Sequence, residues 1–197
     1  MNGKLPVVLE PEEASALLRV PNKRYPTGLR NKAILSIMLN AGLRLSEVIN
    51  LQPSDVNLSK YRLNIIGGKG KRTGDDRRKD GKDRNVYFPD SVSYLLQEWS
   101  NIRPKSKYYF CTLDGKQLSA RYIQSMVYRC RIKAGIEKHI SPHTLRHTFA
   151  TQFYRQYENL VKTQMVLGHS KPATTSIYIH LAGSEIEQEC RNFRDFV

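Results

Sequence analysis

Cysteine is scarce in this chain, with only Cys111, Cys130 and Cys190 among 197 residues. Three cysteines far apart in the sequence fit neither a disulfide framework nor a set of zinc ligands. The sequence also has no apolar run long enough to cross a membrane, and no basic segment followed by an apolar one at its start. We therefore expect a soluble protein of the reducing cytoplasm that has no membrane partner.

Acidic residues are also few. The chain has 18 Asp and Glu but 32 Lys and Arg, which gives a formal net charge of +14 and a pI near 9.8. This imbalance favours an extended polyanion as the partner. No strongly amphipathic basic helix and no lipidation motif points to a membrane surface instead. Nucleic acid is the expected partner, and a charge that serves only solubility is the alternative.

The periodicity of apolar residues predicts mostly helices within one domain, residues 1–197. The hydrophobic fraction of 40% is enough for a substantial core, and no internal repeat divides the chain. Residues 61–66 and 84–88 are expected to pair as antiparallel strands, with residues 107–110 as a candidate third strand. The expected fold is mainly α with a small antiparallel β-sheet of about three strands, an α+β class. The predicted helices cover residues 9–20, 27–41, 43–51, 89–102 and 118–134, and another begins at Ser141.

The helix that begins at Ser141 carries the largest group of chemically active side chains. Ser141 is a good N-cap, and a proline follows it at the first helical position. His143, Arg146 and His147 are spaced to share one face of this helix. A second face is expected to point into the core and consists of Leu145, Phe149 and Phe153.

A second short helix should follow and end at Gly168, where a left-handed residue is wanted. His169 would then lie on a turn. Ser170 can cap a third short helix, which would hold Tyr178 near His169. The buried side of the second helix is expected to consist of Val161, Met165, Val166 and Leu167.

These residue types suit chemistry on a phosphate. One Arg with two His supplies positive charge and hydrogen-bond donors for oxygens that gain charge in a transition state. A nearby Tyr can serve as nucleophile. Each residue also has a structural explanation, because a helical His pair usually supports packing and the chain holds eleven tyrosines. The residues alone do not single out Tyr178.

A second group of polar residues lies after the helix predicted over residues 27–41. That helix is apolar nearly all round, so it should be central and buried, and Gly42 should end it. Arg44 and Glu47 follow, three residues apart and therefore on one helical face. We expect the carboxylate to hold the Arg in place, with an ordinary surface ion pair as the alternative.

Four sequence blocks carry a family resemblance. They are AGLRLSEV at residues 41–48, HTLRH at residues 143–147, LGHS at residues 167–170, and Tyr178 nine residues beyond His169. In this order and spacing they strongly resemble the tyrosine recombinases, the family of the phage integrases and Xer proteins, over about residues 9–190. The resemblance implies six catalytic residues, Arg44, Lys69, His143, Arg146, His169 and Tyr178, with Glu47 and His147 in support.

The lysine among these six is assigned on the resemblance, because the family carries a lysine general acid in the hairpin between two strands. Lys69, in the run GGKGK, aligns best with it, and Lys71 and Lys82 remain alternatives. Nearby cations and partial burial can lower the pKa of such a lysine towards working pH. The composition of this segment, rich in Gly, Asp and charge, predicts a solvated loop.

The resemblance implies a site-specific DNA strand transferase that works through a 3′-phosphotyrosyl intermediate. Neither ATP nor a metal or other cofactor is expected, which agrees with the lack of a P-loop and of a carboxylate cluster. The alternatives are a type IB topoisomerase-like DNA relaxer and a catalytically idle DNA-binding regulator of recombination.

Double-stranded DNA is the partner that the resemblance implies, and the enzyme is expected to be nucleoid-associated. The helix over residues 118–134 is a candidate for groove contact, although surface polarity explains its Arg and Gln equally well. A homotetramer on DNA is expected, with the segment after Tyr178 exchanged between subunits. The family's N-terminal DNA-clamping domain is not expected here, so the chain is either a natural minimal recombinase or a fragment. The candidate DNA contacts are Lys71, Arg121, Gln124 and Lys171.

Overall fold

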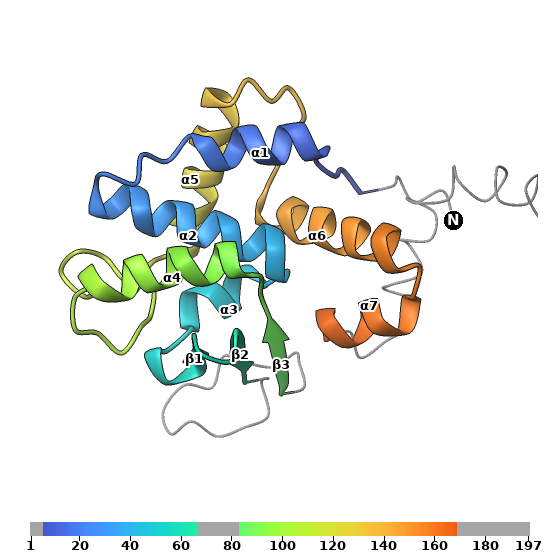
Figure 1. Cartoon of the computed structure of the whole chain (residues 1–197). Coiled ribbons are helices and arrows are strands. Elements are labelled where there is room, and N and C mark those ends of the chain that lie inside the picture. Colours follow the sequence, from blue (N-terminus) through green and yellow to red (C-terminus); the bar gives the residue numbers. More distant parts are fainter. Residues whose placement is uncertain (1–5, 67–82, 169–197) are drawn as a thin grey trace, which may run out of the picture.

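Helix α2 (Pro26–Ala41) is the centre of the fold, as Figure 1 shows for the computed structural model. The structure describes residues 6–66 and 83–168. Within them, α2 packs against α1, α4 and α6. The described elements are α1 (Pro11–Arg19), α2, α3 (Leu45–Asn50), the 3-10 helix η1 (Pro53–Asp55), β1 (Val56–Asn57), β2 (Arg62–Ile65), β3 (Arg84–Tyr87), α4 (Asp90–Ile102), α5 (Ala120–Lys133), α6 (Pro142–Tyr157) and α7 (Leu160–Leu167).

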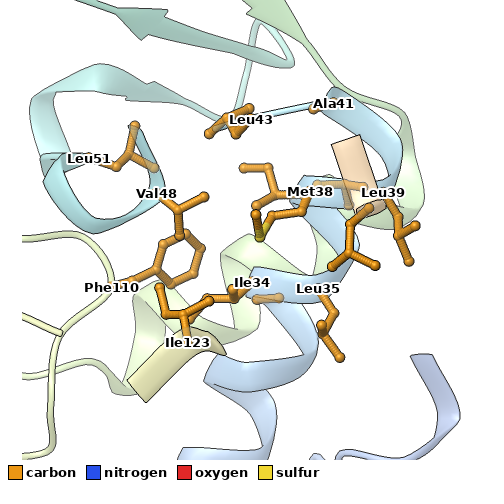
Figure 2. Close-up of a cluster of buried hydrophobic side chains, with 14 of the residues drawn as sticks. Ile34, Leu35, Met38, Leu39, Ala41, Leu43, Val48, Leu51, Phe110 and Ile123 are labelled. Atoms are coloured by element: carbon orange, nitrogen blue, oxygen red, sulfur yellow. The ribbon is translucent and has the colours of Figure 1, made fainter. Parts of the chain in front are cut away.

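The side chains of α2 are buried nearly all round, as the sequence predicts. Ile34 and Met38 have no exposed surface and meet Val48 of α3, together with Phe110 and Ile123 (Figure 2). Burial of each such side chain contributes about 1.5 to 3 kcal/mol. This core fixes the C-terminal end of α2, from which the candidate site begins.

Gly42 ends α2 in the left-handed conformation, with φ of 63°, as expected. A Cβ atom at this position would lie 2.3 Å from Cδ1 of Phe149 on α6. The glycine therefore serves both the turn and the close approach of α2 to α6.

The substitution Gly42→Ala should therefore cost more stability than left-handed strain alone. The strain costs about 1 to 2 kcal/mol, and overpacking against Phe149 adds about 1 to 3 kcal/mol. The matched control is Gly135→Ala, because Gly135 has φ of 69° but no atom within 4 Å of its added Cβ. Urea unfolding of both variants should show a larger loss for Gly42→Ala, and equal losses would contradict the packing argument.

The predicted helix start at Ser141 is confirmed, and a second serine caps α5. The Ser141 hydroxyl accepts a hydrogen bond from the backbone N–H of Thr144, at the start of α6. The Ser119 hydroxyl accepts one from the backbone N–H of Tyr122, at the start of α5. Each cap satisfies one of the backbone donors that a helix leaves unpaired in its first turn.

The expected antiparallel sheet is confirmed, and the described part of the chain is mainly α with three strands in the order β1-β2-β3. Strand β2 pairs with β3, with Leu63 opposite Val86, and both side chains are fully buried. The sheet lies at one end of the molecule (Figure 1). The identity of the third strand was predicted wrongly, because it is β1, directly before β2, and not residues 107–110.

Residues 107–110 form bends and not a strand. The reason is that side chains from other positions donate hydrogen bonds to their backbone carbonyls. The carbonyl of Tyr109 accepts hydrogen bonds from Nε1 of Trp99 and Nε of Arg103, and Arg103 also bonds the carbonyl of Tyr108. Tyr109 and Phe110 are buried in the main core. Their aromatic side chains serve core packing in this loop, which a strand pattern in the sequence does not distinguish from sheet formation.

The predicted buried side of α7 was also wrong in part. Val161 and Met165 are 64% and 71% exposed, whereas Thr163 and Leu167 are fully buried. Thr163 and Leu167 lie four residues apart, on the side of the helix opposite to Val161 and Met165. The Thr163 hydroxyl donates to the carbonyl of Asn159 at 2.9 Å, so it can be buried without losing its hydrogen bond.

Among the helices of residues 6–66 and 83–168, none combines the length and the apolar character that crossing a membrane requires.

Candidate active site

Arg146 joins the ends of two helices from its place on α6. Its side chain is 5% exposed, and one terminal nitrogen donates to the carbonyl of Gly42 while the other donates to the carbonyl of Leu167 at 2.6 Å. These carbonyls lie at the C-terminal ends of α2 and α7, where helices leave acceptors unpaired and carry partial negative charge. The guanidinium is therefore held in one orientation by backbone groups.

Arg44 reaches the same end of α7 from a distant part of the chain. It precedes α3 as its N-cap residue, and its Nη2 donates to the carbonyl of Gly168 at 3.5 Å. Arg146 bonds the carbonyl of the adjacent residue, Leu167. The two guanidinium groups thus meet at the last turn of α7, and the Arg44 side chain keeps 27% of its surface exposed.

Glu47 holds Arg44 in place through two contacts. Its carboxylate accepts a hydrogen bond from Nη1 of Arg44 at 2.9 Å and another from the Arg44 backbone N–H at 2.8 Å. This is the ion pair expected from the three-residue spacing. The Glu47 side chain is only 12% exposed, so the pair is not an ordinary surface one.

A third arginine, Arg84 at the start of β3, completes this cluster. Its two terminal nitrogens donate to the two oxygens of Glu47 at 2.7 and 2.9 Å. Burial by itself raises the pKa of the Glu47 carboxyl, but the hydrogen bonds and charge of Arg84, the Arg44 backbone and the charge of Arg146 lower that pKa to about 2. Glu47 is therefore ionised at neutral pH.

The lowered pKa of Glu47 predicts a pH-dependent contribution to stability. Since the folded value of about 2 lies below the ordinary 4.5, the contribution is fully present above about pH 4.5 and is lost as the pH falls towards 2. The substitution Glu47→Gln should cost on the order of 3 kcal/mol at neutral pH. Unfolding by urea should be measured between pH 2 and 7. The difference in unfolding free energy between Glu47→Gln and the unchanged protein should shrink as the pH falls.

The control for this experiment is Glu137→Gln, which removes an exposed carboxylate. Exposed charges contribute little, so its effect should be small at every pH. A Glu47→Gln gap that stayed constant down to pH 2 would contradict the assigned role of the carboxylate.

The two histidines of α6 differ in exposure. His143, in the first turn, is exposed, whereas His147 is half-buried. Burial, together with the positive charges of His143 and Arg146, lowers the pKa of His147. The neutral form of His147 is therefore favoured, and its supporting role stays a prediction.

The structure brings together Arg44, Glu47 and Arg146 among the residues singled out from the sequence. Arg121 and Gln124 lie exposed on α5, away from its buried side. Six others lie outside the described residues, and their roles stay predictions. They are Lys69, Lys71, Lys82, His169, Lys171 and Tyr178.

Arg84 was missed by the sequence reasoning, although its position carries a signal. In the predicted strand, Arg84 falls on the same face as Val86 and Phe88, which are buried. An arginine on the inward face of a strand needs a buried partner. Its partner, Glu47, belongs to a different predicted element, so the sequence alone does not supply the pair.

Among residues 6–66 and 83–168, no three His, Cys, Asp or Glu side chains gather in a way that could hold a metal ion. The expectation that no metal or other cofactor is needed stays a prediction.

Known proteins resemble this chain in sequence. The sequence matches the model of the Phage integrase family over residues 7–185. The tyrosine recombinases XerD of Staphylococcus saprophyticus and Staphylococcus aureus are 36% and 34% identical to it. Both alignments cover 96% of this chain but 63% of the relative, so the chain spans less than two thirds of the length of these relatives.

Solved structures of related proteins share the fold. The crystal structure of the XerA recombinase superposes with a TM-score of 0.82 at 31% identity, covering 99% of this chain and 68% of that one. The XerH site-specific recombinase, bound to its palindromic difH substrate, gives a TM-score of 0.77 at 29% identity, covering 95% of this chain and 53% of XerH. The resemblance noted in the four sequence blocks thus extends over the whole described fold, and the chain belongs to the phage integrase family.

Proposed function

We propose that this chain is the catalytic part of a site-specific DNA recombinase. The observation that carries the proposal is the meeting of Arg44 and Arg146 at the last turn of α7. The sequence continues from Gly168 directly into His169 and reaches Tyr178 nine residues later. Relatives described as tyrosine recombinases and as a site-specific recombinase support the same reaction class.

The cluster of charges suits a scissile phosphate. Arg44, Arg84 and Arg146 bring three positive charges against the single negative charge of Glu47. Planar guanidinium groups can grip two non-bridging oxygens at once, which a lysine cannot imitate. Such preorganised donors stabilise the charge that gathers on phosphate oxygens in the transition state.

In the proposed reaction, the Tyr178 hydroxyl oxygen attacks the scissile phosphorus. A 3′-phosphotyrosyl bond forms, the bond to the 5′ oxygen breaks, and Lys69 protonates that leaving oxygen. His143 accepts the tyrosine proton, and His169 donates a hydrogen bond to the phosphate. The 5′ hydroxyl of a partner strand then attacks the phosphotyrosine, giving its proton to Lys69, and a phosphodiester forms as the bond to the Tyr178 oxygen breaks. His143 returns the proton to Tyr178. Since the bond energy is kept in the covalent link, the cycle consumes no ATP.

DNA contact and assembly form a second part of the proposal. The exposed Arg121 and Gln124 are suited to reach a DNA groove from α5, while Lys71 and Lys171 would contact phosphates. A palindromic substrate, like that of XerH, would suit pairs of symmetric subunits. We propose a homotetramer on nucleoid DNA, with exchange of the segment after Tyr178.

A nicked duplex tests the proposal, because cleavage near the nick releases a short fragment and traps the covalent intermediate. The substrates are candidate sites from DNA next to the encoding locus, and the readout is a protein–DNA adduct that resists denaturation. Adduct formation with joining of two sites supports a recombinase. Adduct formation with only relaxation of supercoils indicates a topoisomerase-like enzyme, and DNA binding without any adduct indicates an idle regulator.

A further inference from the structure

We infer that Arg84 is a positioning residue that keeps Arg44 available to the scissile phosphate by pairing bidentately with the Glu47 carboxylate. This inference rests on the proposed function and names a residue beyond those assigned to the reaction. We assign Arg84 to the carboxylate and not to DNA, because both of its terminal nitrogens donate to Glu47, whereas the terminal nitrogens of Arg146 donate to uncharged carbonyls.

The geometry of the carboxylate carries the inference. Glu47 Oε1 accepts from both Arg44 and Arg84, while Oε2 accepts from Arg84 and from the Arg44 backbone N–H. The Arg84 contact is bidentate, whereas the Arg44 side chain makes a single contact. A bidentate pair is stronger than a single contact, so most of the negative charge of Glu47 is paired with Arg84.

Charge balance explains why this matters for a phosphate. Glu47 with two arginines carries one net positive charge, whereas Glu47 with Arg44 alone is neutral. Without Arg84, the carboxylate is free to pair bidentately with Arg44 and to turn its guanidinium away from the substrate. Arg84 therefore lets one carboxylate orient Arg44 without neutralising the site.

Arg84 also supports the turn at which Arg44 and Arg146 meet. A Cβ atom at Gly168 would lie 2.5 Å from Cδ of Arg84, so the arginine side chain packs directly on this glycine. Strand β3 and helix α7 are in contact here. Arg84 therefore has two roles that an experiment must separate. One is to pack against this turn and support it, and the other is to balance the charge of Glu47.

The experiment compares Arg84→Met with the double variant Arg84→Met/Glu47→Gln in single-turnover cleavage of the nicked duplex. Arg84→Met should slow adduct formation by about 100-fold, the cost of misplacing a catalytic group by about 1 Å. Its affinity for DNA should stay within about twofold, because Arg84 does not contact DNA. Adding Glu47→Gln removes the unbalanced negative charge and should restore the rate by about tenfold or more.

Controls separate the outcomes. Arg103→Met removes one half-buried positive charge whose partners are the loop carbonyls of Ser106, Tyr108 and Tyr109, and it should not slow cleavage. Arg84→Lys keeps the charge but loses the bidentate contact, and it serves if Arg84→Met does not fold; its cleavage rate should lie between those of the unchanged protein and Arg84→Met. An unchanged rate in Arg84→Met, or a double variant no faster than the single one, would overturn the inference. Absence of any adduct from the unchanged protein would instead count against the proposed function.

Discussion

Replacement of Tyr178 by Phe should abolish the covalent protein–DNA adduct and leave DNA affinity within about twofold of its original value. The phenol oxygen is the atom that would form the bond to phosphorus, and phenylalanine keeps the ring without it. The measurement pairs denaturing gel electrophoresis of the nicked-duplex reaction with a binding titration at fixed salt, because affinity for DNA depends steeply on salt.

The matched control is Tyr157→Phe, which removes the hydroxyl of an exposed tyrosine at the end of α6. It should form the adduct at the unchanged rate. If the adduct survived Tyr178→Phe and disappeared in another Tyr→Phe variant, the nucleophile would be that other tyrosine, and the assignment of residue 178 would be wrong.

The substitution Arg146→Lys should lower the cleavage rate by about 100-fold or more. Other enzymes lose rate by this factor when one hydrogen-bond donor to the transition state is removed. A lysine keeps the charge but cannot bond the carbonyls of Gly42 and Leu167 while also presenting a fork to a phosphate. Stability should fall as well, because the lost hydrogen bonds satisfy carbonyls at the C-terminal ends of α2 and α7. Thermal unfolding therefore accompanies the rate measurement, which is made well below the melting temperature.

Arg30→Lys is the control for the stability effect. Arg30 is 3% exposed on α2 and donates to the carbonyl of Cys111 and the hydroxyl of Tyr122. Its replacement should lower the melting temperature without slowing cleavage by the folded protein. Equal losses of rate in both variants would mean that Arg146 acts only through the fold.

Local patterns were sufficient to predict the helices and their ends. The apolar run of α2, its left-handed Gly42 and the serine cap of α6 are signals that act within a few residues of the chain. The choice of Arg44 and Glu47 as a pair followed from helical spacing in the same way. The catalytic labels, by contrast, came from the resemblance, because the isolated residues have structural explanations too.

The errors arose where distant segments decide the outcome. Residues 107–110 have strand-like composition, but Trp99 and Arg103 take the carbonyl of Tyr109, and the aromatic rings fill the core. In α7, the contact with α6 selects the face of Thr163 and Leu167 over the more apolar face of Met165. Arg84 was overlooked because its partner, Glu47, lies beyond the reach of local periodicity.

A double-mutant cycle on the cleavage rate tests most directly whether Arg44 and Arg146 act on one phosphate. The cycle compares Arg44→Lys, Arg146→Lys and the combined variant, with adduct formation on the nicked duplex as the readout. If both guanidinium groups grip the same phosphate as a unit, the combined loss should be much smaller than the product of the two single losses. A combined loss equal to that product would show that the two arginines act independently, which would contradict the account.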